Sequence, residues 1–206
     1  MTDKFTVYLV DDDPGVLKAL SRQLRARGYQ VKPYLSPQLF LDEHDVTVPG
    51  CAILDVSMPG LDGLQLQRAL TAAGGSHRPV VFVTGKGDVP TSVRAMKAGA
   101  IDFLTKPVKD KDLFEAVSSA EALDAESRRL HSELESMRAK VGTLTPRERE
   151  VLRHVVAGRL NKQIAGDLGT VEKTIKVHRS RMMEKLGVRM VADLVRMAEK
   201  LNLSKQ

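Results

Sequence analysis

The sequence predicts an α/β fold with a five-stranded, doubly wound parallel sheet, followed by a linker helix and an all-α helix-turn-helix domain. Over residues 1–120, five short β-rich runs alternate with five helical segments, a pattern typical of right-handed crossovers and a parallel sheet. Residues 121–142 contain no Pro and a single, terminal Gly, and they read as a helical linker. Residues 143–206 hold short helical segments separated by glycines, which indicates a second, smaller domain.

The charge of the chain divides in a similar way. Residues 1–122 hold 14 Lys and Arg against 15 Asp and Glu, residues 123–142 hold 4 of each, and residues 143–206 hold 14 against 7. The net charge of +6 therefore arises in the last third of the chain. A near-neutral first part and a basic last part suggest two functions, of which the second involves nucleic acid.

Composition narrows the class of protein. The chain has 206 residues, 42% of them hydrophobic and 28% charged, which is enough for two small domains. No apolar run approaches the roughly 18 residues of a membrane span, and the first residues lack the pattern of a signal peptide. We therefore expect a cytoplasmic protein with no membrane partner. The one cysteine, Cys51, lies in an apparent strand and should be an inert buried thiol, since a redox sensor needs exposure.

Local signals place the elements of the first domain. Pro14 opens a helix that Asp13 or a neighbour can cap, and Gly28 ends it. The apolar side chains of this helix share one face and are Val16, Leu17, Leu20 and Leu24. Further helices are expected at 37–44, 64–73 and 89–98 and from about residue 110, and strands at 6–10, 29–34, 51–54, 79–84 and 101–105.

The third strand ends in a carboxylate. The apolar run Cys51 to Leu54 leads into Asp55, and Pro59 and Gly60 then force a turn. This reads as a buried parallel strand that delivers Asp55 to the sheet edge where open α/β folds bind ligands. The alternative is that Asp55 only caps the following segment, as Asp residues before turns often do.

Other polar residues fall at the ends of neighbouring strands. Strand one ends in Asp11 and Asp12, strand four in Thr84, and strand five runs into Lys106. In a 2-1-3-4-5 sheet these ends meet Asp55 at one edge, where clustered carboxylates favour a hard cation such as Mg²⁺. A cation, an ammonium and a hydroxyl around one carboxylate suit phosphoryl transfer. Alternatively, the two aspartates cap a helix, and Lys106 and Thr84 are an ordinary surface lysine and a strand-end hydroxyl.

Residues 5–120 resemble the receiver domain of two-component response regulators, which has a flavodoxin-like fold. The matching segments are Val10-Asp11-Asp12, Leu54-Asp55-Val-Ser-Met-Pro-Gly60, Thr84-Gly85, Met96-Lys-Ala-Gly-Ala100 and Phe103-Leu-Thr-Lys106-Pro107. The resemblance implies that Asp55 accepts a phosphoryl group from a sensor histidine kinase. It also implies that Asp12, Asp55 and the carbonyl of Ser57 bind Mg²⁺, with Asp11 assisting.

The same resemblance assigns the remaining receiver residues. Thr84 and Lys106 would bind the phosphoryl oxygens, Phe103 would be the switch aromatic beside Thr84, and the bond between Lys106 and Pro107 would be cis. Lys86, two residues beyond Thr84, can either fold over the phosphoryl group and lengthen its lifetime or point into solvent.

The linker carries a short heptad pattern. Leu123, Leu130 and Met137 are seven residues apart, and Leu134 and Val141 form a second row. This predicts either a coiled coil with a second chain or a single amphipathic helix that lies on one of the domains.

The last third begins with a capping box. Thr145, Pro146 and Glu148 occupy the cap, first and third helical positions of a helix over 146–157 with a core face of Val151, Leu152 and Val155. A second short helix is expected over 161–168, and a third over 171–186, capped by Thr170 and buried through Ile175, Met182 and Leu186. Two helices joined by a tight Gly turn fit a helix-turn-helix. The basic residues of the third helix indicate either a DNA contact or an ordinary solvated face.

Residues 144–200 resemble the LuxR-type output domain of the FixJ/NarL branch of response regulators. The segments that carry this resemblance are Leu144–Leu152, Gly158–Ala165, Thr174–His178 and Lys185–Val188, and residues 84–90 point to the FixJ-like subgroup. The resemblance implies that residues of the third helix face base edges: Lys176, Val177 and Ser180. It implies phosphate contacts by Asn161, Lys173, Thr174, Arg179 and Arg181. The final helix, 191–201, would supply a dimer contact, although Met190 stands where many relatives have a capping Ser or Thr.

We therefore expect a phosphorylation-dependent transcriptional regulator, specifically an activator, with double-stranded promoter DNA, RNA polymerase and a sensor kinase as partners and a homodimer as the phosphorylated form. It is expected not to be an enzyme, apart from its own phosphoryl transfer and slow dephosphorylation. Two alternatives remain. A phosphatase would use Asp55 as nucleophile but would want a second carboxylate where Ser57 stands. A docking module would never be phosphorylated, and the acidic cluster argues against it.

Overall fold

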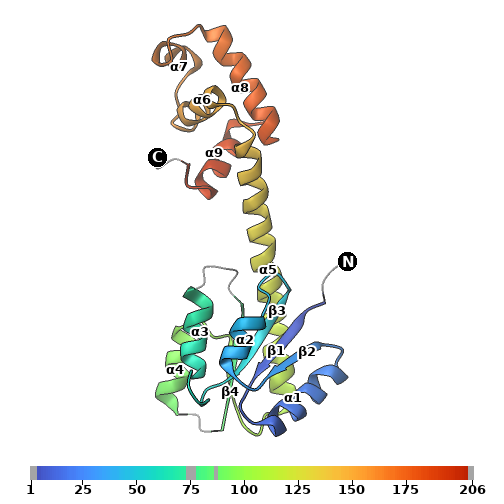
Figure 1. Cartoon of the computed structure of the whole chain (residues 1–206). Coiled ribbons are helices and arrows are strands. Elements are labelled where there is room, and N and C mark those ends of the chain that lie inside the picture. The colour runs from blue at the N-terminus through green and yellow to red at the C-terminus, as the bar shows by residue number, and fades with distance from the viewer. Residues whose placement is uncertain (1–3, 73–77, 86–87, 204–206) are drawn as a thin grey trace. The chain divides into compact units, whose positions relative to one another are not determined.

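The computed structural model describes residues 4–72, 78–85 and 88–203, which fold as two units, Met1–Arg128 and Arg129–Gln206 (Figure 1). The first unit holds the strands β1 (Thr6–Val10), β2 (Gln30–Tyr34), β3 (Gly50–Asp55), β4 (Val80–Thr84) and β5 (Asp102–Thr105). All neighbouring pairs are parallel and the strand order is β2-β1-β3-β4-β5. The predicted sheet and its order are confirmed.

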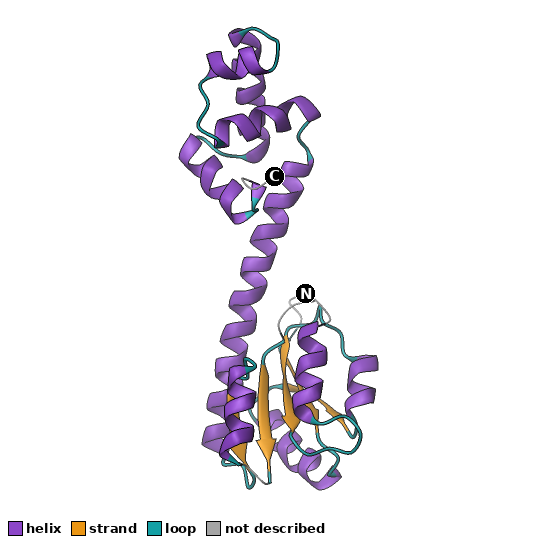
Figure 2. Ribbon diagram, turned by 90° about the vertical axis from the view of Figure 1, so that its left-hand side faces the viewer, coloured by secondary structure: helices purple, strands orange, loops and turns teal. Residues whose placement is uncertain are grey.

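Five helices alternate with these strands: α1 (Pro14–Ala26), α2 (Pro37–Glu43), α3 (Gly63–Ala72), α4 (Val89–Lys97) and α5 (Asp110–Gly142). They cover both faces of the sheet (Figure 2). Because successive strand side chains point to opposite faces, Val7 and Leu9 pack into one core with α1 and α5, whereas Tyr8 and Val10 pack into another with α2, α3 and α4. β1, β3 and β4 are buried along their whole length, as expected for central parallel strands.

Local chemistry fixes the ends of several elements. Asp13 caps α1 by accepting hydrogen bonds from the backbone N–H groups of Gly15 and Val16. At the start of α3, Gly63 lies so close to the Asp55 carbonyl that an added Cβ would collide with it. A glycine there lets α3 begin directly against the strand that carries Asp55.

Cys51 is fully buried in β3, and burial raises the pKa of its thiol to about 12, in agreement with the inert thiol expected.

The linker differs from the prediction, because residues 121–142 are not a separate element. They continue α5, which runs unbroken from Asp110 to Gly142. The heptad row does not form one surface: Met137 and Val141 pack against the core of the second unit, whereas Leu123 and Leu130 are exposed. The amphipathic-helix alternative therefore holds for Met137 and Val141, and pairing of Leu123 and Leu130 between chains stays a prediction.

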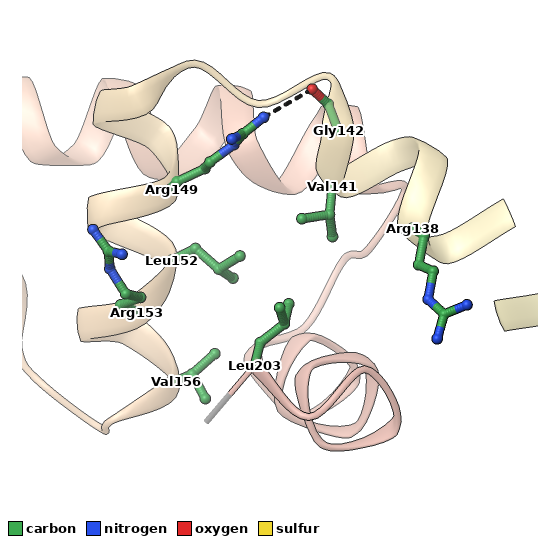
Figure 3. Close-up of a pocket in the computed structure, with 8 residues that line it drawn as sticks. All are labelled: Arg138, Val141, Gly142, Arg149, Leu152, Arg153, Val156 and Leu203. Atoms are coloured by element: carbon green, nitrogen blue, oxygen red, sulfur yellow. Dashed lines mark hydrogen bonds between the residues drawn. The ribbon is translucent and has the colours of Figure 1, made fainter. Parts of the chain in front are cut away.

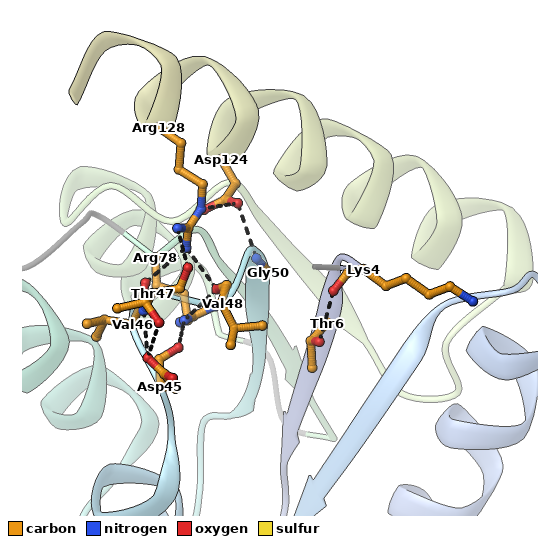
Figure 4. A network of polar contacts seen from close by, with 10 residues as sticks. All are labelled: Lys4, Thr6, Asp45, Val46, Thr47, Val48, Gly50, Arg78, Asp124 and Arg128. Carbon is orange, nitrogen blue, oxygen red and sulfur yellow. Dashed lines mark hydrogen bonds and ion pairs between the residues drawn. The ribbon is translucent and has the colours of Figure 1, made fainter. Parts of the chain in front are cut away.

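Two charged residues on α5, Asp124 and Arg128, bind this helix to the loop between α2 and β3, and we call this pair the clasp. Asp124 is only 2% exposed and accepts hydrogen bonds from Gly50 N at 3.1 Å and from Arg128 Nε at 2.8 Å. The Arg128 guanidinium also donates to the carbonyls of Val46, Thr47 and Val48 at 2.7–2.9 Å (Figure 4). The buried carboxylate is thus paired, and the loop carbonyls have donors.

A second arginine holds the same loop from inside. Arg78 donates to the carbonyls of Asp45 at 2.7 Å and Val48 at 3.2 Å, and its guanidinium lies 4.5 Å from the centre of the Tyr8 ring. Burial lowers the pKa of Arg78 from its usual value. The loop carbonyls and the face of the Tyr8 ring offset this cost by interacting with the positive charge. Together, Arg78 and the clasp fix the edge of the sheet opposite Asp55.

The second unit contains the end of α5 and the helices α6 (Pro146–Val156), α7 (Asn161–Asp167), α8 (Glu172–Leu186) and α9 (Val191–Lys200). Its core includes the predicted Val151, Leu152, Val155, Ile175, Met182 and Leu186. The capping box is confirmed: Thr145 Oγ1 accepts from Glu148 N, and Glu148 Oε2 accepts from Thr145 N. The predicted cap of α8 is wrong, since the helix begins at Glu172 after Val171, which provides no side-chain hydrogen bond. Met190 likewise provides no side-chain cap to α9.

Glu148 also joins α6 to α8. Lys185 Nζ lies 2.7 Å from Glu148 Oε2, and this hydrogen bond lowers the pKa of the Glu148 carboxyl, which is 3% exposed. The ion pair was not foreseen from the sequence, because its partners are 37 residues apart.

We expect Arg128→Ala to destabilise the first unit by about 3 kcal/mol, because it leaves a buried carboxylate unpaired and removes donors from three carbonyls. All three tyrosines lie in this unit, so tyrosine fluorescence during urea denaturation reports on it alone. Lys111→Ala, on the same helix and in the same unit, is the matched control and should cost under about 0.5 kcal/mol, since its pair with Glu115 is long and exposed. Equal losses in the two variants would contradict a structural role for the clasp.

The Glu148–Lys185 pair should make the second unit sensitive to acid. A carboxyl whose pKa is lowered by folding contributes stability above its unfolded pKa and loses it as the pH falls through the folded pKa. Hydrogen exchange of α6 and α8, corrected for intrinsic rates, should therefore lose protection below about pH 4.5. In Glu148→Gln, protection should be lower at pH 7 and nearly flat over this window. A wild-type pH dependence in the variant would exclude this pair as its source.

Candidate functional site

The carboxyl ends of β1, β3 and β5 bring three charged side chains together. Lys106 Nζ lies 2.6 Å from Asp11 Oδ2 and 2.7 Å from Asp55 Oδ1. Both aspartates are buried, at 4% and 6% exposure, and Lys106 is half-buried. The predicted convergence of Asp11, Asp55 and Lys106 at this edge is therefore seen in the structure.

Burial and pairing act against each other in this cluster. Burial raises the pKa of Asp11, and the hydrogen bonds from Lys106 and from Asp13 N offset only part of that effect. Burial disfavours the ammonium of Lys106, but the hydrogen bonds and charges of Asp11 and Asp55 together outweigh it and raise the Lys106 pKa. The lysine is thus held in its charged form between two carboxylates. Without this pairing, burying the carboxylates would cost free energy.

Each oxygen of Asp55 has a donor. Oδ1 accepts from Lys106, and Oδ2 accepts from Ser57 N at 2.6 Å in the turn that follows β3. Asp11 Oδ1 accepts from Asp13 N at 3.0 Å. Since Asp13 caps α1, neither Asp11 nor Asp12 is the helix cap, and the alternative reading of these two residues is excluded.

Magnesium remains an expectation with a suitable donor set. Asp12 is exposed beside the buried pair, and Asp11, Asp12 and Asp55 offer the carboxylate oxygens that this cation prefers. Within the part of the chain that the structure describes, however, no three His, Cys, Asp or Glu side chains are already arranged as a metal site. The ammonium of Lys106 takes up carboxylate oxygens in this arrangement.

Thr84 and Phe103 lie where the resemblance placed them along the strands. Thr84 is buried at the end of β4, and its carbonyl accepts from Lys106 N at 2.7 Å. Phe103 is partly buried in β5, with its ring 6.2 Å from that of Phe82. The bond between Lys106 and Pro107 is cis, as expected. The expectation for Lys86 falls outside the described residues.

The predicted DNA-contacting residues gather on α8 and at the start of α7. On α8, the buried face consists of Ile175, Met182 and Leu186, so the predicted core face is confirmed. The residues assigned to DNA are exposed in the case of Lys173, Lys176, Val177, Ser180 and Arg181, and half-buried in the case of Asn161, Thr174 and Arg179. Lys176 Nζ lies 3.1 Å from Glu172 Oε1, an exposed pair that DNA can replace at little cost.

Two of these residues also contact each other. Arg179 Nη1 donates to Asn161 Oδ1 at 2.9 Å, which links α8 to the first residue of α7. Sequence reasoning placed both as phosphate contacts and missed this bond. The clasp was missed as well, although Asp124 and Arg128 have the i, i+4 spacing that favours an ion pair on a helix.

No helix within the described residues is long and apolar enough to cross a bilayer.

Comparison with known proteins supports both units. Residues 7–118 match the response regulator receiver domain, and residues 142–198 match the luxR family of bacterial regulatory proteins. Response regulator protein TmoT of Ectopseudomonas mendocina is 44% identical over 95% of this chain and 88% of its own. Nodulation protein W of Bradyrhizobium diazoefficiens is 40% identical over 98% of this chain and 88% of its own.

Solved structures agree with these relatives. The response regulator StyR matches with a TM-score of 0.84 and 43% identity, covering 96% of this chain and 99% of that one. Full-length FixJ from B. japonicum matches with a TM-score of 0.58 and 35% identity, covering 98% and 99%. The receiver at one end, the LuxR-type DNA-binding domain at the other and relatives that span both make one conclusion plain: the chain belongs to the two-component response regulators of the FixJ type and is a transcription regulator.

Proposed function

We propose that this regulator is switched on when Asp55 accepts a phosphoryl group from a sensor histidine kinase, and that the phosphorylated form activates transcription. The observation that carries the proposal is the position of Lys106, which holds a buried Asp55 carboxylate at the open edge of the sheet through a 2.7 Å contact. An ammonium so placed can neutralise charge on a group that becomes attached to Asp55.

In the transfer step, an Asp55 oxygen attacks phosphorus, and the phosphorus–nitrogen bond of the phosphohistidine breaks with the electron pair returning to the imidazole. Oδ1 and Oδ2 are held by Lys106 and by Ser57 N, so the carboxylate is oriented before the donor arrives. Lys106 then exchanges a carboxylate oxygen for a phosphoryl oxygen, and Thr84 offers its hydroxyl to another.

Asp11, Asp12, Asp55 and the carbonyl of Ser57 would hold Mg²⁺. The bound cation would supply positive charge against the phosphoryl oxygens in addition to that of Lys106. The residues around it hold the acceptor oriented through both of its oxygens, and the buried strand ends limit the access of water. Catalysis beyond this self-phosphorylation and slow dephosphorylation is not proposed, because Ser57 stands where a second acid–base carboxylate would be needed.

Dimerisation of the phosphorylated form is proposed to use the α4 side of the receiver. Val89, Val93 and Met96 expose apolar side chains on this helix, at 75%, 44% and 46%. Thr84, at the end of β4, and Phe103, on the adjacent β5, can shift together when the hydroxyl turns toward a phosphoryl group. The exposed residues would then be covered by those of a second copy.

At the output end, α8 is proposed to enter the major groove of promoter DNA. Lys176, Val177 and Ser180 would face base edges, and the other assigned residues would contact phosphates: Asn161, Lys173, Thr174, Arg179 and Arg181. α9 would contribute a dimer contact on DNA, and a bound dimer would recruit RNA polymerase.

We expect Asp55→Asn to take up no phosphoryl label from acetyl phosphate and Mg²⁺, since an amide is a poor nucleophile and a weaker metal ligand. Its affinity for DNA should equal that of the unphosphorylated wild type. Asp62→Asn, at a turn carboxylate that accepts from Gln65 N, is the control and should be labelled normally. Stoichiometric labelling of Asp55→Asn would show that the acceptor is another residue.

Treatment with the phosphoryl donor should convert the wild type from monomer to dimer at micromolar concentration in sedimentation. Val93→Glu should take up label as the wild type does and yet remain monomeric, because it places charge in the apolar α4 surface. Leu39→Glu, at a similarly exposed leucine on α2, should dimerise normally. If Val93→Glu dimerises like the wild type, the contact lies elsewhere.

Lys176→Ala should weaken binding to the cognate site by about 1–3 kcal/mol and relax base preference, whereas Lys173→Ala should weaken all sequences alike and lower the salt slope by about one. Both lysines are exposed on α8, so each is the other's control. Identical losses on cognate and random DNA in both variants would overturn the proposed orientation of α8.

A further inference from the structure

The second unit contains a pocket that neither phosphoryl transfer nor DNA binding uses. It has a volume of about 410 Å³ and lies between the last turns of α5, one face of α6 and Leu203. This volume falls in the range of small-molecule sites, which is roughly 300–1,000 Å³. None of the residues lining it belongs to α8, the helix assigned to DNA.

The floor of the pocket is aliphatic. Val141 of α5, Leu152 and Val156 of α6, and Leu203 face one another across the hollow (Figure 3). They belong to the core of the second unit or pack against it, so the floor is held in place from behind. An apolar group that covers this floor removes apolar surface from water, which is favourable. A hydrated phosphate would bring no such gain.

The rim of the pocket is cationic. Arg149 and Arg153 come from α6 and Arg138 from α5, and none of the described residues that line the pocket is Asp or Glu. With Leu152 and Val156, the two α6 arginines occupy positions i, i+3, i+4 and i+7, which form one stripe of the helix. The guanidinium charge is thus concentrated around an apolar centre.

The three arginines are weakly engaged. Arg149 donates to the Gly142 carbonyl at 3.1 Å, which spans the top of the pocket without neutralising the charge. Arg138 pairs with Glu135 on its own helix, where both side chains are more than half exposed, and such pairs are worth little. The Arg153 guanidinium makes no hydrogen bond or ion pair with any residue in the described part of the chain.

We propose that this pocket binds a small organic anion with an apolar body, such as an aromatic or medium-chain carboxylate or sulfonate. The apolar part would cover the four aliphatic side chains, and the acid group would lie at the rim, where Arg153 and Arg138 can swing toward it and Arg149 already lies. Such a ligand would contact the end of α5 and α6 at once, and so would hold the last turn of α5 against α6 within the second unit.

The test uses the full-length protein and two fluorescent probes of similar shape, anionic 1-anilinonaphthalene-8-sulfonate and neutral N-phenyl-1-naphthylamine. We expect saturable binding of the sulfonate at one site per chain and weaker binding of the amine. Arg153→Glu should weaken the sulfonate about five-fold or more, by replacing one attractive charge with a repulsive one, and should leave the amine unchanged. Leu203→Ala should weaken both probes.

Arg159→Glu is the matched control, because Arg159 is an exposed arginine just beyond α6 that pairs with Asp167 and does not line the pocket. It should change the sulfonate affinity by less than about two-fold. Amide shifts in labelled protein should move around residues 138–156 and 203, and promoter DNA should not displace the probe. Equal weakening by Arg153→Glu and Arg159→Glu, or displacement by DNA, would show a diffuse basic surface and overturn the proposal. If Arg153→Glu alters the fold by circular dichroism, Arg153→Ala with the amide shifts decides the question in the same way.

Discussion

The receiver depends on one electrostatic constraint. Two buried carboxylates at one sheet edge repel each other and have lost hydration, so a cation must lie between them. Lys106 meets this need by contacting Asp11 and Asp55 together. The parallel sheet makes the arrangement available, since β1, β3 and β5 all end at the same edge, and full burial of the central strands keeps water from weakening the attraction. Asp55 is consequently restrained through both of its carboxylate oxygens.

The features of the fold and of the site that depend on local sequence patterns could be predicted. The parallel sheet followed from the alternation of strands and helices, and the site followed from the polar residue that ends each strand. The capping box and the core face of α8 followed from spacing. In contrast, distant contacts away from the strand ends were not predicted: Lys185 with Glu148, Arg179 with Asn161, and Arg128 with the loop carbonyls each need the tertiary fold to bring them together. The capping error at Thr170 was of another kind, because a helix can begin without a side-chain cap when its first turn is exposed.

The second unit distributes its charge unequally among its helices. On α8, Lys173, Lys176 and Arg181 are exposed whereas Ile175, Met182 and Leu186 are buried, which suits a groove lined by phosphates. On α6, one acidic residue is buried against Lys185, whereas two arginines border an aliphatic hollow. Two basic surfaces can therefore suit different ligands, because the neighbouring apolar area decides whether a bare phosphate or an amphipathic acid fits better.

The clasp also bears on how such regulators are divided and recombined. The receiver family pattern stops at residue 118, but Asp124 and Arg128 complete the hydrogen bonding of β3 and of the loop before it. A receiver excised at residue 118 or 120 would expose the backbone of Gly50 and leave the loop carbonyls to water. Chimaeras that exchange output domains between regulators should therefore be joined after Arg128, within the long helix, without a break in that helix at the junction. In this protein the first ten residues past the family boundary belong to the signal-receiving unit, and the interchangeable module begins only beyond them.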